Sequence, residues 1–178
     1  KKNAFLLGDF NDWSLNGVHQ MQRDQDYFWI TLEALEKGKE YQFQYLIDGE
    51  ILVADPYTEK IISRFDDTQI RNENRYPNLD PYPIDNTNFE VSVLQPFKPI
   101  YEWKESSFQK PKKEDLVIYE LLVRDFTDQR TFQSVIDKLD YLDSLGINAL
   151  ELMPIMEFEG NESWGYNPAF MMAVDKYY

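Results

Sequence analysis

The alternation of apolar and polar residues predicts short β-strands in the first half of the chain. Residues 41–47 show it most clearly, because aromatic and aliphatic side chains fill the odd positions while Gln42 and Gln44 fill even ones. Successive side chains of a strand point to opposite faces, so this run predicts a strand with an apolar face and a polar face.

A hairpin turn follows this strand in the sequence. Asp48 and Gly49 both tolerate the positive φ of a two-residue type I′ turn, so residues 51–54 are expected to return as the next strand. Several short strands separated by turn residues predict an all-β, immunoglobulin-like sandwich over residues 1–94. The remaining predicted strands lie at residues 4–7, 28–32 and 89–94.

Two stretches break this pattern. Residues 64–88 are polar and rich in Asn, Asp and Pro, which predicts an irregular loop. Residues 95–114 contain three prolines and a group of lysines, and we interpret them as a linker between two parts of the chain.

The apolar pattern changes its period in the last third. Residues 116–123 are almost continuously apolar, as expected for a strand covered on both faces. Residues 132–145 carry apolar side chains at helical spacing, with Thr131 placed to cap the start of the helix and Gly146 placed just beyond its end.

A second apolar run, at residues 147–153, completes a strand–helix–strand unit. Such units place their two strands parallel, with a right-handed crossover. We therefore expect residues 115–178 to be the first β/α units of a TIM (β/α)₈ barrel. A complete barrel takes roughly 250 residues, so the remainder of the barrel is expected C-terminal to Tyr178.

Composition narrows the classes of partner. The net charge of −14 argues against binding to nucleic acid or to an anionic membrane surface. There is no cysteine, and no apolar run approaches the ~18 residues of a membrane span. Aromatic residues make up 16% of the chain, which suits stacking on sugars as well as a β-rich core. We predict no cofactor and no metal site.

Particular motifs resemble a known family. The runs VIYELLVRDF at 117–126, LGINALELMP at 145–154 and WGYNP at 164–168 resemble the start of the catalytic barrel in the α-amylase family, glycoside hydrolase family 13. The runs GDFNDW at 8–13, YQFQY at 41–45, IDG at 47–49 and ADP at 54–56 are similar to carbohydrate-binding module family 48. Together the motifs cover nearly the whole chain, in the order found in amylase-type, branching and debranching enzymes.

The resemblance implies an α-glucan polysaccharide or oligosaccharide as ligand. It also implies a retaining glycoside hydrolase or transglycosylase, which needs two carboxyl groups roughly 5 Å apart. In the family these carboxyl groups follow later barrel strands, so we assign no catalytic residue to this chain. We expect the 178-residue chain by itself to be inactive.

Four residues are candidate sugar contacts by the same resemblance. Tyr166 corresponds to the tyrosine that stacks on the sugar beside the scissile bond, and Trp164 and Asn167 either shape its loop or contact sugar. Trp13 occupies the position of a sugar-stacking tryptophan of the binding module. The alternative for each is packing within its own loop.

Two departures from the module's pattern leave other functions open. Ile51 stands where the module has its second stacking residue, and Gln44 stands where a basic residue is usual. The chain could be part of a non-catalytic α-glucan-binding or regulatory protein, or its sandwich could be purely structural and dock on the barrel. Charged residues near predicted strand ends, such as Asp125 and Glu157, are expected to form structural ion pairs.

Overall fold

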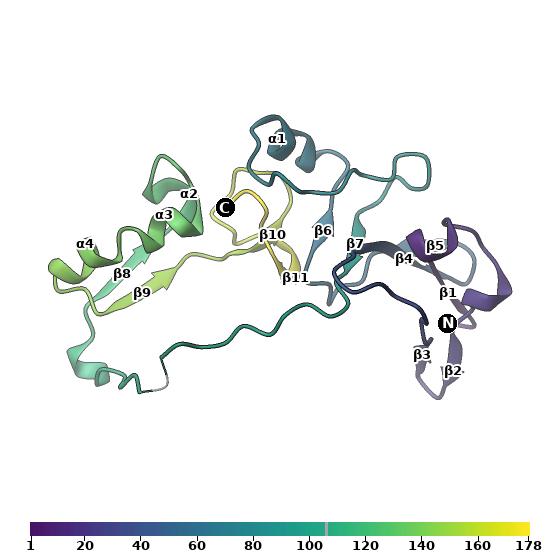
Figure 1. Ribbon diagram of the computed structural model, residues 1–178, viewed down its shortest axis with the longest axis horizontal. Coiled ribbons are helices and arrows are strands. Elements are labelled where there is room, and N and C mark those ends of the chain that lie inside the picture. The colour runs from purple at the N-terminus through teal and green to yellow at the C-terminus, as the bar shows by residue number, and fades with distance from the viewer. Residues whose placement is uncertain (106) are drawn as a thin grey trace.

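The computed structural model describes residues 1–105 and 107–178. Residue 106, which falls in the predicted linker, lies outside the described residues. An antiparallel sheet forms one end of the molecule, and a pair of parallel strands flanked by helices forms the other (Figure 1). A long extended segment joins them, and the C-terminal hairpin lies between them.

The N-terminal part is built from antiparallel strands. The main sheet has the order β1-β4-β7-β6, with β5 paired to β4, and β2 and β3 form a separate two-stranded sheet. The strands of the N-terminal part are β1 (Ala4–Gly8), β2 (Gln22–Asp24), β3 (Tyr27–Trp29), β4 (Tyr41–Ile47), β5 (Ile51–Val53), β6 (Ile61–Ile62) and β7 (Val91–Leu94). Short 3₁₀ helices are η1 (Asp9–Asn11), η2 (Gly17–His19) and, later in the chain, η3 (Lys113–Asp115).

The hairpin turn between β4 and β5 lies at Asp48 and Gly49 as predicted, but Ile47 pairs with Ile51, so the loop has three residues rather than the predicted two. Asp48 has φ 54° and Gly49 has φ 74°, both in the left-handed region that a type I′ turn requires. The Asp48 carboxylate also accepts hydrogen bonds from the backbone N–H groups of Lys2 and Asn3, at 2.6 and 3.0 Å. These bonds lower the pKa of Asp48 and tie the start of the chain to the turn.

The polar face of β4 is covered. Gln42 and Gln44 are buried, and their side-chain amides donate to the carbonyl oxygens of Pro81 (2.9 Å) and Glu90 (2.7 Å). Both acceptors belong to the segment that precedes β7, so the chain itself lies over this face. The amide nitrogens are thus hydrogen-bonded, while the side-chain oxygens of Gln42 and Gln44 are buried without a partner among the described residues.

The predicted irregular loop at 64–88 contains a helix, so that prediction was wrong in part. Helix α1 (Asp66–Asn72) has two aspartates in its first turn, where they complement the helix dipole. Ile70 lies in the core, where it packs against residues that are mostly distant in sequence. A helix this short, with one buried aliphatic residue, produces almost no helical periodicity in the sequence.

The main core also contains a residue from the far end of the chain. Tyr177 is buried among side chains of β6, α1 and β7. The cluster consists of Ile62, Ile70, Leu79, Val91, Val93 and Tyr177. Tyr177 thus ties the end of the chain to the N-terminal core, while Leu121, Val123 and Val135 form a second buried cluster beside the parallel strands.

The second part contains the predicted parallel strands. β8 (Ile118–Leu121) pairs in parallel with β9 (Ala149–Leu152), and helices lie between them in sequence. The helix predicted over 132–145 is interrupted at Asp137 and Lys138, so it forms two short helices. The helices of this part are α2 (Val123–Phe126), α3 (Phe132–Ile136) and α4 (Leu139–Ser144).

The predicted helix ends are confirmed. Thr131 Oγ1 accepts a hydrogen bond from the backbone N–H of Ser134 at 3.2 Å, and the Ser134 hydroxyl accepts one from the N–H of Thr131. Gly146 follows α4 with φ 79°, a conformation that glycine adopts without strain.

An unpredicted hairpin closes the chain. β10 (Met156–Phe158) and β11 (Pro168–Val174) pair antiparallel with irregular register. The hairpin lies between the two ends of the molecule in Figure 1. It brings Glu157 and the residues after β11 against α1.

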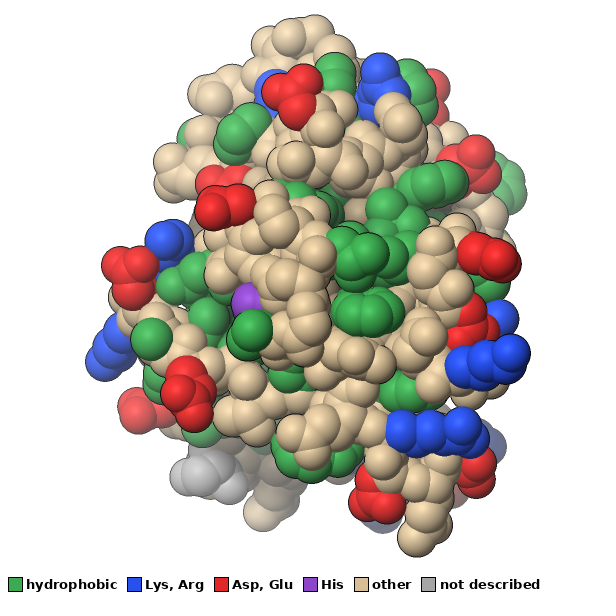
Figure 2. All heavy atoms as spheres, turned by 90° about the vertical axis from the view of Figure 1, so that its right-hand side faces the viewer, with side chains coloured by type: hydrophobic (Ala, Val, Ile, Leu, Met, Phe, Trp, Pro, Cys, Tyr) green, Lys and Arg blue, Asp and Glu red, His purple; other side chains and the backbone are tan. Residues whose placement is uncertain are grey.

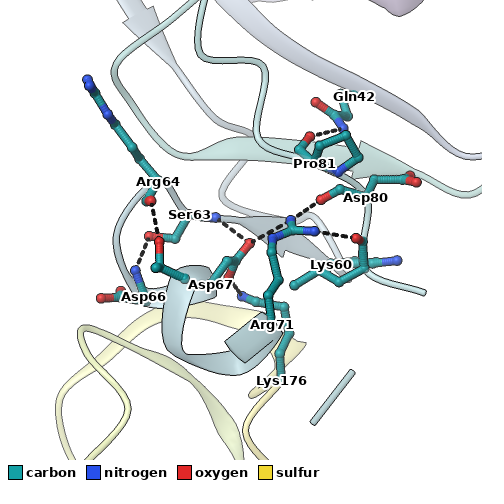
Figure 3. A network of polar contacts seen from close by, with 12 residues as sticks. Gln42, Lys60, Ser63, Arg64, Asp66, Asp67, Arg71, Asp80, Pro81 and Lys176 are labelled. Atoms are coloured by element: carbon teal, nitrogen blue, oxygen red, sulfur yellow. Dashed lines mark hydrogen bonds and ion pairs between the residues drawn. The ribbon is translucent and has the colours of Figure 1, made fainter. Parts of the chain in front are cut away.

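Buried charges occupy the junction between α1 and this hairpin. Lys176 Nζ is paired with Glu157 and lies 3.4 Å from Asp67 Oδ1, and all three side chains are buried. Asp67 also accepts from the N–H of Ser63 at 3.0 Å and lies 4.0 Å from Arg71 (Figure 3). Lys176 thus pairs with two buried carboxylates, and Asp67 has Arg71 as a second cationic neighbour.

Burial determines the direction of the pKa shifts of the acidic groups at this junction. It raises the pKa of Glu157 to about 7, even though Lys176 acts in the opposite direction. Burial alone would lower the pKa of Lys176, but the charges of Glu157 and Asp67 outweigh burial and raise it. The pKa of Asp67 and that of Asp175 are also raised by burial.

A Glu157→Gln variant is expected to change the pH dependence of stability. Because the folded state holds its proton on Glu157 up to about pH 7, the free energy of unfolding should fall as pH rises from about 4.5 to about 7. The fall from this group would be about 3 kcal/mol, since one pKa unit corresponds to about 1.4 kcal/mol. Urea unfolding at several pH values should show a flatter curve for Glu157→Gln.

The matched control is Glu36→Gln, because Glu36 pairs with Lys39 on the exposed surface. It should leave the pH curve unchanged. Identical slopes for Glu157→Gln and the unsubstituted chain would contradict the assignment.

Candidate functional site

Three of the four predicted site residues come together on one loop. Trp164, Tyr166 and Asn167 lie on the loop between β10 and β11, in the part of the chain that comes after β9. The side chains of Trp164 and Tyr166 are 64% and 67% exposed, so both rings are open to solvent. An exposed pair of aromatic rings on a defined loop can present flat apolar faces to a ligand.

Gly165 fixes the path of the loop between the two rings. It has φ 83°, and a Cβ at this position would overlap the carbonyl oxygen of Pro154. Its N–H donates to Ser163 Oγ at 3.0 Å, and the Ser163 hydroxyl is also hydrogen-bonded to Asn167 Oδ1. The Asn167 side chain therefore shapes the loop, as one of the two sequence interpretations proposed.

Arg124 connects this loop to the end of β8. One of its terminal nitrogens, Nη1, donates to the carbonyl oxygen of Ser163 at 3.1 Å. Nε and Nη2 donate to the two carboxylate oxygens of Asp125, at 2.7 and 3.1 Å. These hydrogen bonds lower the pKa of Asp125 and raise that of Arg124. The expected structural ion pair of Asp125 is thus confirmed, and Arg124 serves the loop as well.

A Gly165→Ala variant should displace the loop. Left-handed backbone costs a residue with a Cβ about 1–2 kcal/mol, and the overlap with Pro154 should add about 1–3 kcal/mol. Gly160→Ala is the matched control, because Gly160 also has positive φ (81°) while its Cβ would meet nothing within 4 Å. Thermal unfolding and limited proteolysis should show the larger effect for Gly165→Ala. Equal effects would exclude Pro154 as the constraint.

Trp13 lies elsewhere in the fold. Its ring is partly buried and packs against the core cluster that contains Tyr177. Its indole N–H donates to Asp9 Oδ1 at 3.1 Å, and the other Asp9 oxygen accepts from the N–H of Gln42 at 2.7 Å. The structure does not bring Trp13 close to the aromatic loop.

The other two positions of the binding-module pattern do not form a platform with Trp13. Gln44 is fully buried beneath the segment before β7, while Ile51 is exposed. On the opposite face of the sheet lies a cavity of about 550 Å³, lined by apolar residues that include Leu6, Trp29 and Phe43. Figure 2 shows this end of the molecule, with apolar side chains exposed among charged ones.

The sequence did not identify the residues that hold the loop. The Arg124 guanidinium binds the carbonyl oxygen of Ser163, 39 residues further on, and the Pro154 carbonyl lies against Gly165. The Ser163 hydroxyl acts within the loop, on Gly165 and Asn167. A glycine between two aromatic residues was the one available signal. Within residues 1–105 and 107–178, His, Asp and Glu side chains form no group of three suited to a metal ion, and no helix is long and apolar enough to cross a membrane.

The fold and the site together define a type of protein region. An antiparallel β part precedes a parallel β/α pair, and a rigidly held aromatic loop follows the second parallel strand. Such a loop suits a neutral ligand with flat apolar faces, the character of a pyranose ring.

Known proteins are similar to this chain in sequence or in fold. The chain is 34% identical to malto-oligosyltrehalose trehalohydrolase of Saccharolobus solfataricus over 91% of its length, and 32% identical to the chloroplastic isoamylase 1 of Arabidopsis thaliana over 93%. Among solved structures, a candidate α-amylase of Salmonella typhimurium covers 100% of the chain with a TM-score of 0.68 at 22% identity. The GBS pullulanase SAP in complex with maltotetraose covers 99% with a TM-score of 0.65 at 20% identity.

These similarities support one family. The chain resembles the N-terminal region of proteins of the α-amylase family, glycoside hydrolase family 13. A scan against protein-family models matches none of them. The chain spans 24% and 19% of the two curated relatives named above, and 25% and 26% of the two solved chains.

Proposed function

We propose that the chain is the N-terminal part of a retaining α-glucan-active glycoside hydrolase or transglycosylase. The observation that carries this proposal is the exposed Trp164–Tyr166 loop, held by Arg124 and Pro154 beyond the parallel strands β8 and β9. Active sites of β/α barrels lie at the carboxyl ends of their strands, which is where such a loop belongs. The names of the relatives, which include isoamylase and pullulanase, support an α-glucan ligand.

The proposed organisation has two functional parts. Residues 1–94 form an immunoglobulin-like sandwich, and residues 115–178 supply the first β/α unit of a (β/α)₈ barrel. Residues 95–114 are the linker between these two parts. Tyr166 stacks on the sugar beside the scissile bond, with Trp164 at the rim and Asn167 holding the loop. The two catalytic carboxyl groups come from other parts of the complete enzyme, so the residues of this chain bind the glucan and orient it.

Hydrolysis or transfer of α-glucan tests this proposal directly. A complete protein that contains this chain should release reducing ends from glycogen or soluble starch, or alter their branching, and NMR should show products with retained α-configuration. The 178-residue chain alone should release none. A complete protein inactive on all α-1,4 and α-1,6 glucans would contradict the proposal.

Trp13 is the proposed glucan contact of the N-terminal part. Its packing against the core favours the alternative, in which the sandwich serves as a structural support for the barrel. Retention on insoluble starch separates the two roles. Retention that Trp13→Ala abolishes would support glucan binding, and absence of retention would support the structural role.

A further inference from the structure

The connecting segment between β7 and η3 carries a dense set of exposed apolar side chains. It runs extended between the two ends of the molecule (Figure 1). Ile100 and Trp103 are 91% and 84% exposed, among the highest values for large apolar residues in the described chain. We call this set the linker anchors: Phe97, Ile100, Tyr101, Trp103 and Phe108.

Single exposed apolar residues are ordinary on protein surfaces, but several of them close together along one segment indicate an interaction surface. Tyr101 and Trp103 already pack against each other, with ring centroids 5.3 Å apart and planes at 85°. Tryptophan and tyrosine carry a large share of the binding energy at protein interfaces. The pair is therefore arranged before any partner binds.

The segment is attached near both of its ends. Lys98 Nζ pairs with Glu59 at 2.9 Å, next to the N-terminal sheet. At the other end, Asn148 donates to the carbonyl oxygen of Asp115 at 2.8 Å and accepts from the N–H of Val117 at 2.7 Å. These contacts attach the two ends of the segment to the fold and leave the linker anchors between them exposed.

We infer that the linker anchors dock on an apolar protein surface formed by the part of the enzyme that this chain does not span. The chain covers about a quarter of its solved relatives, yet aligns with them over 99–100% of its own length, so the longer chains contain the same framework. β8 and β9 also expose apolar side chains that require a cover, among them Ile118 and Leu152. One further body of polypeptide covers both surfaces.

The chemistry of the set favours protein over glucan as the partner. Edge-to-face packing occupies one ring face of the Tyr101–Trp103 pair, which removes a stacking surface for sugar. Ile100, the most exposed member, has no ring to stack. Aliphatic and aromatic anchors together are typical of the core of a protein interface.

The test measures the exposure of Trp103 with and without the rest of the enzyme. Tryptophans are labelled with 5-fluorotryptophan, and Trp103→Phe identifies the ¹⁹F signal of Trp103. In the 178-residue chain this signal should shift between H₂O and D₂O, and in the complete protein the shift should be lost. Trp103→Ser should lower the melting temperature of the complete protein, because it removes an aromatic anchor from the interface.

Tyr57→Ser removes an equally exposed ring outside the segment and should leave both proteins unchanged. A solvent-exposed Trp103 in the complete protein would overturn the inference. So would protection of Trp103 in the chain alone by added maltotetraose, or by self-association seen in sedimentation. A complete protein that cleaves glycogen while Trp103 stays exposed would remove this inference and leave the proposed function intact.

Discussion

Lys176→Met is expected to destabilise the protein by about 3–5 kcal/mol, because removing one partner of a buried ion pair leaves the other charge without compensation. Lys176 is the ammonium between Glu157 and Asp67, and all three side chains are buried. Methionine conserves most of the volume, so the loss reports on charge rather than on a cavity. Urea unfolding near pH 7.5 measures it.

The loss should depend on pH in a defined direction. Protonation of Glu157 removes one uncompensated charge, and burial already raises the pKa of Glu157 to about 7. The difference between Lys176→Met and the unsubstituted chain should therefore shrink as pH falls below 7. Lys39→Met is the control, because Lys39 pairs with Glu36 at the exposed surface and its loss should cost little. A cost for Lys176→Met as small as that of the control would show that the junction does not rely on this ammonium.

Tyr166→Ala should reduce kcat/KM of the complete enzyme on α-glucan about 100-fold, which corresponds to about 2.7 kcal/mol of transition-state stabilisation. The exposed ring is proposed to lie against the sugar beside the scissile bond, so its loss removes both contact area and alignment. Steady-state kinetics on soluble starch measures the change.

Tyr166→Phe separates the ring from its hydroxyl and should keep most of the activity. Both variants should melt at the temperature of the unsubstituted protein, since Tyr166 is exposed and lies outside the buried core. Full activity of Tyr166→Ala would exclude the proposed stacking role.

Elements defined by local chemistry could be predicted from the sequence. The Asp48–Gly49 turn, the Thr131 cap and the glycine after α4 depend on residues close in the chain, and each is observed. The parallel pairing of β8 and β9 was also predicted, because strand–helix–strand connections of this length have one common solution.

Elements defined by contacts distant in sequence could not be predicted. Helix α1 has a single buried aliphatic residue and depends on a core completed by Tyr177. The hairpin of β10 and β11 joins strands of irregular register, with no turn signature that marks its ends. For the site, the aromatic residues carried a recognisable motif, but Arg124 could be assigned to the loop only from the position of Ser163.

The place of Tyr177 limits how freely this region could be exchanged between enzymes. A gene fragment that ends before it would encode a sheet whose interior lacks one of its largest side chains. Recombination at the linker would then separate the N-terminal sheet from Tyr177, so both recombined proteins would have an incomplete core. Evolution is thus expected to pass the two parts on together, as an inherited unit rather than as separable modules.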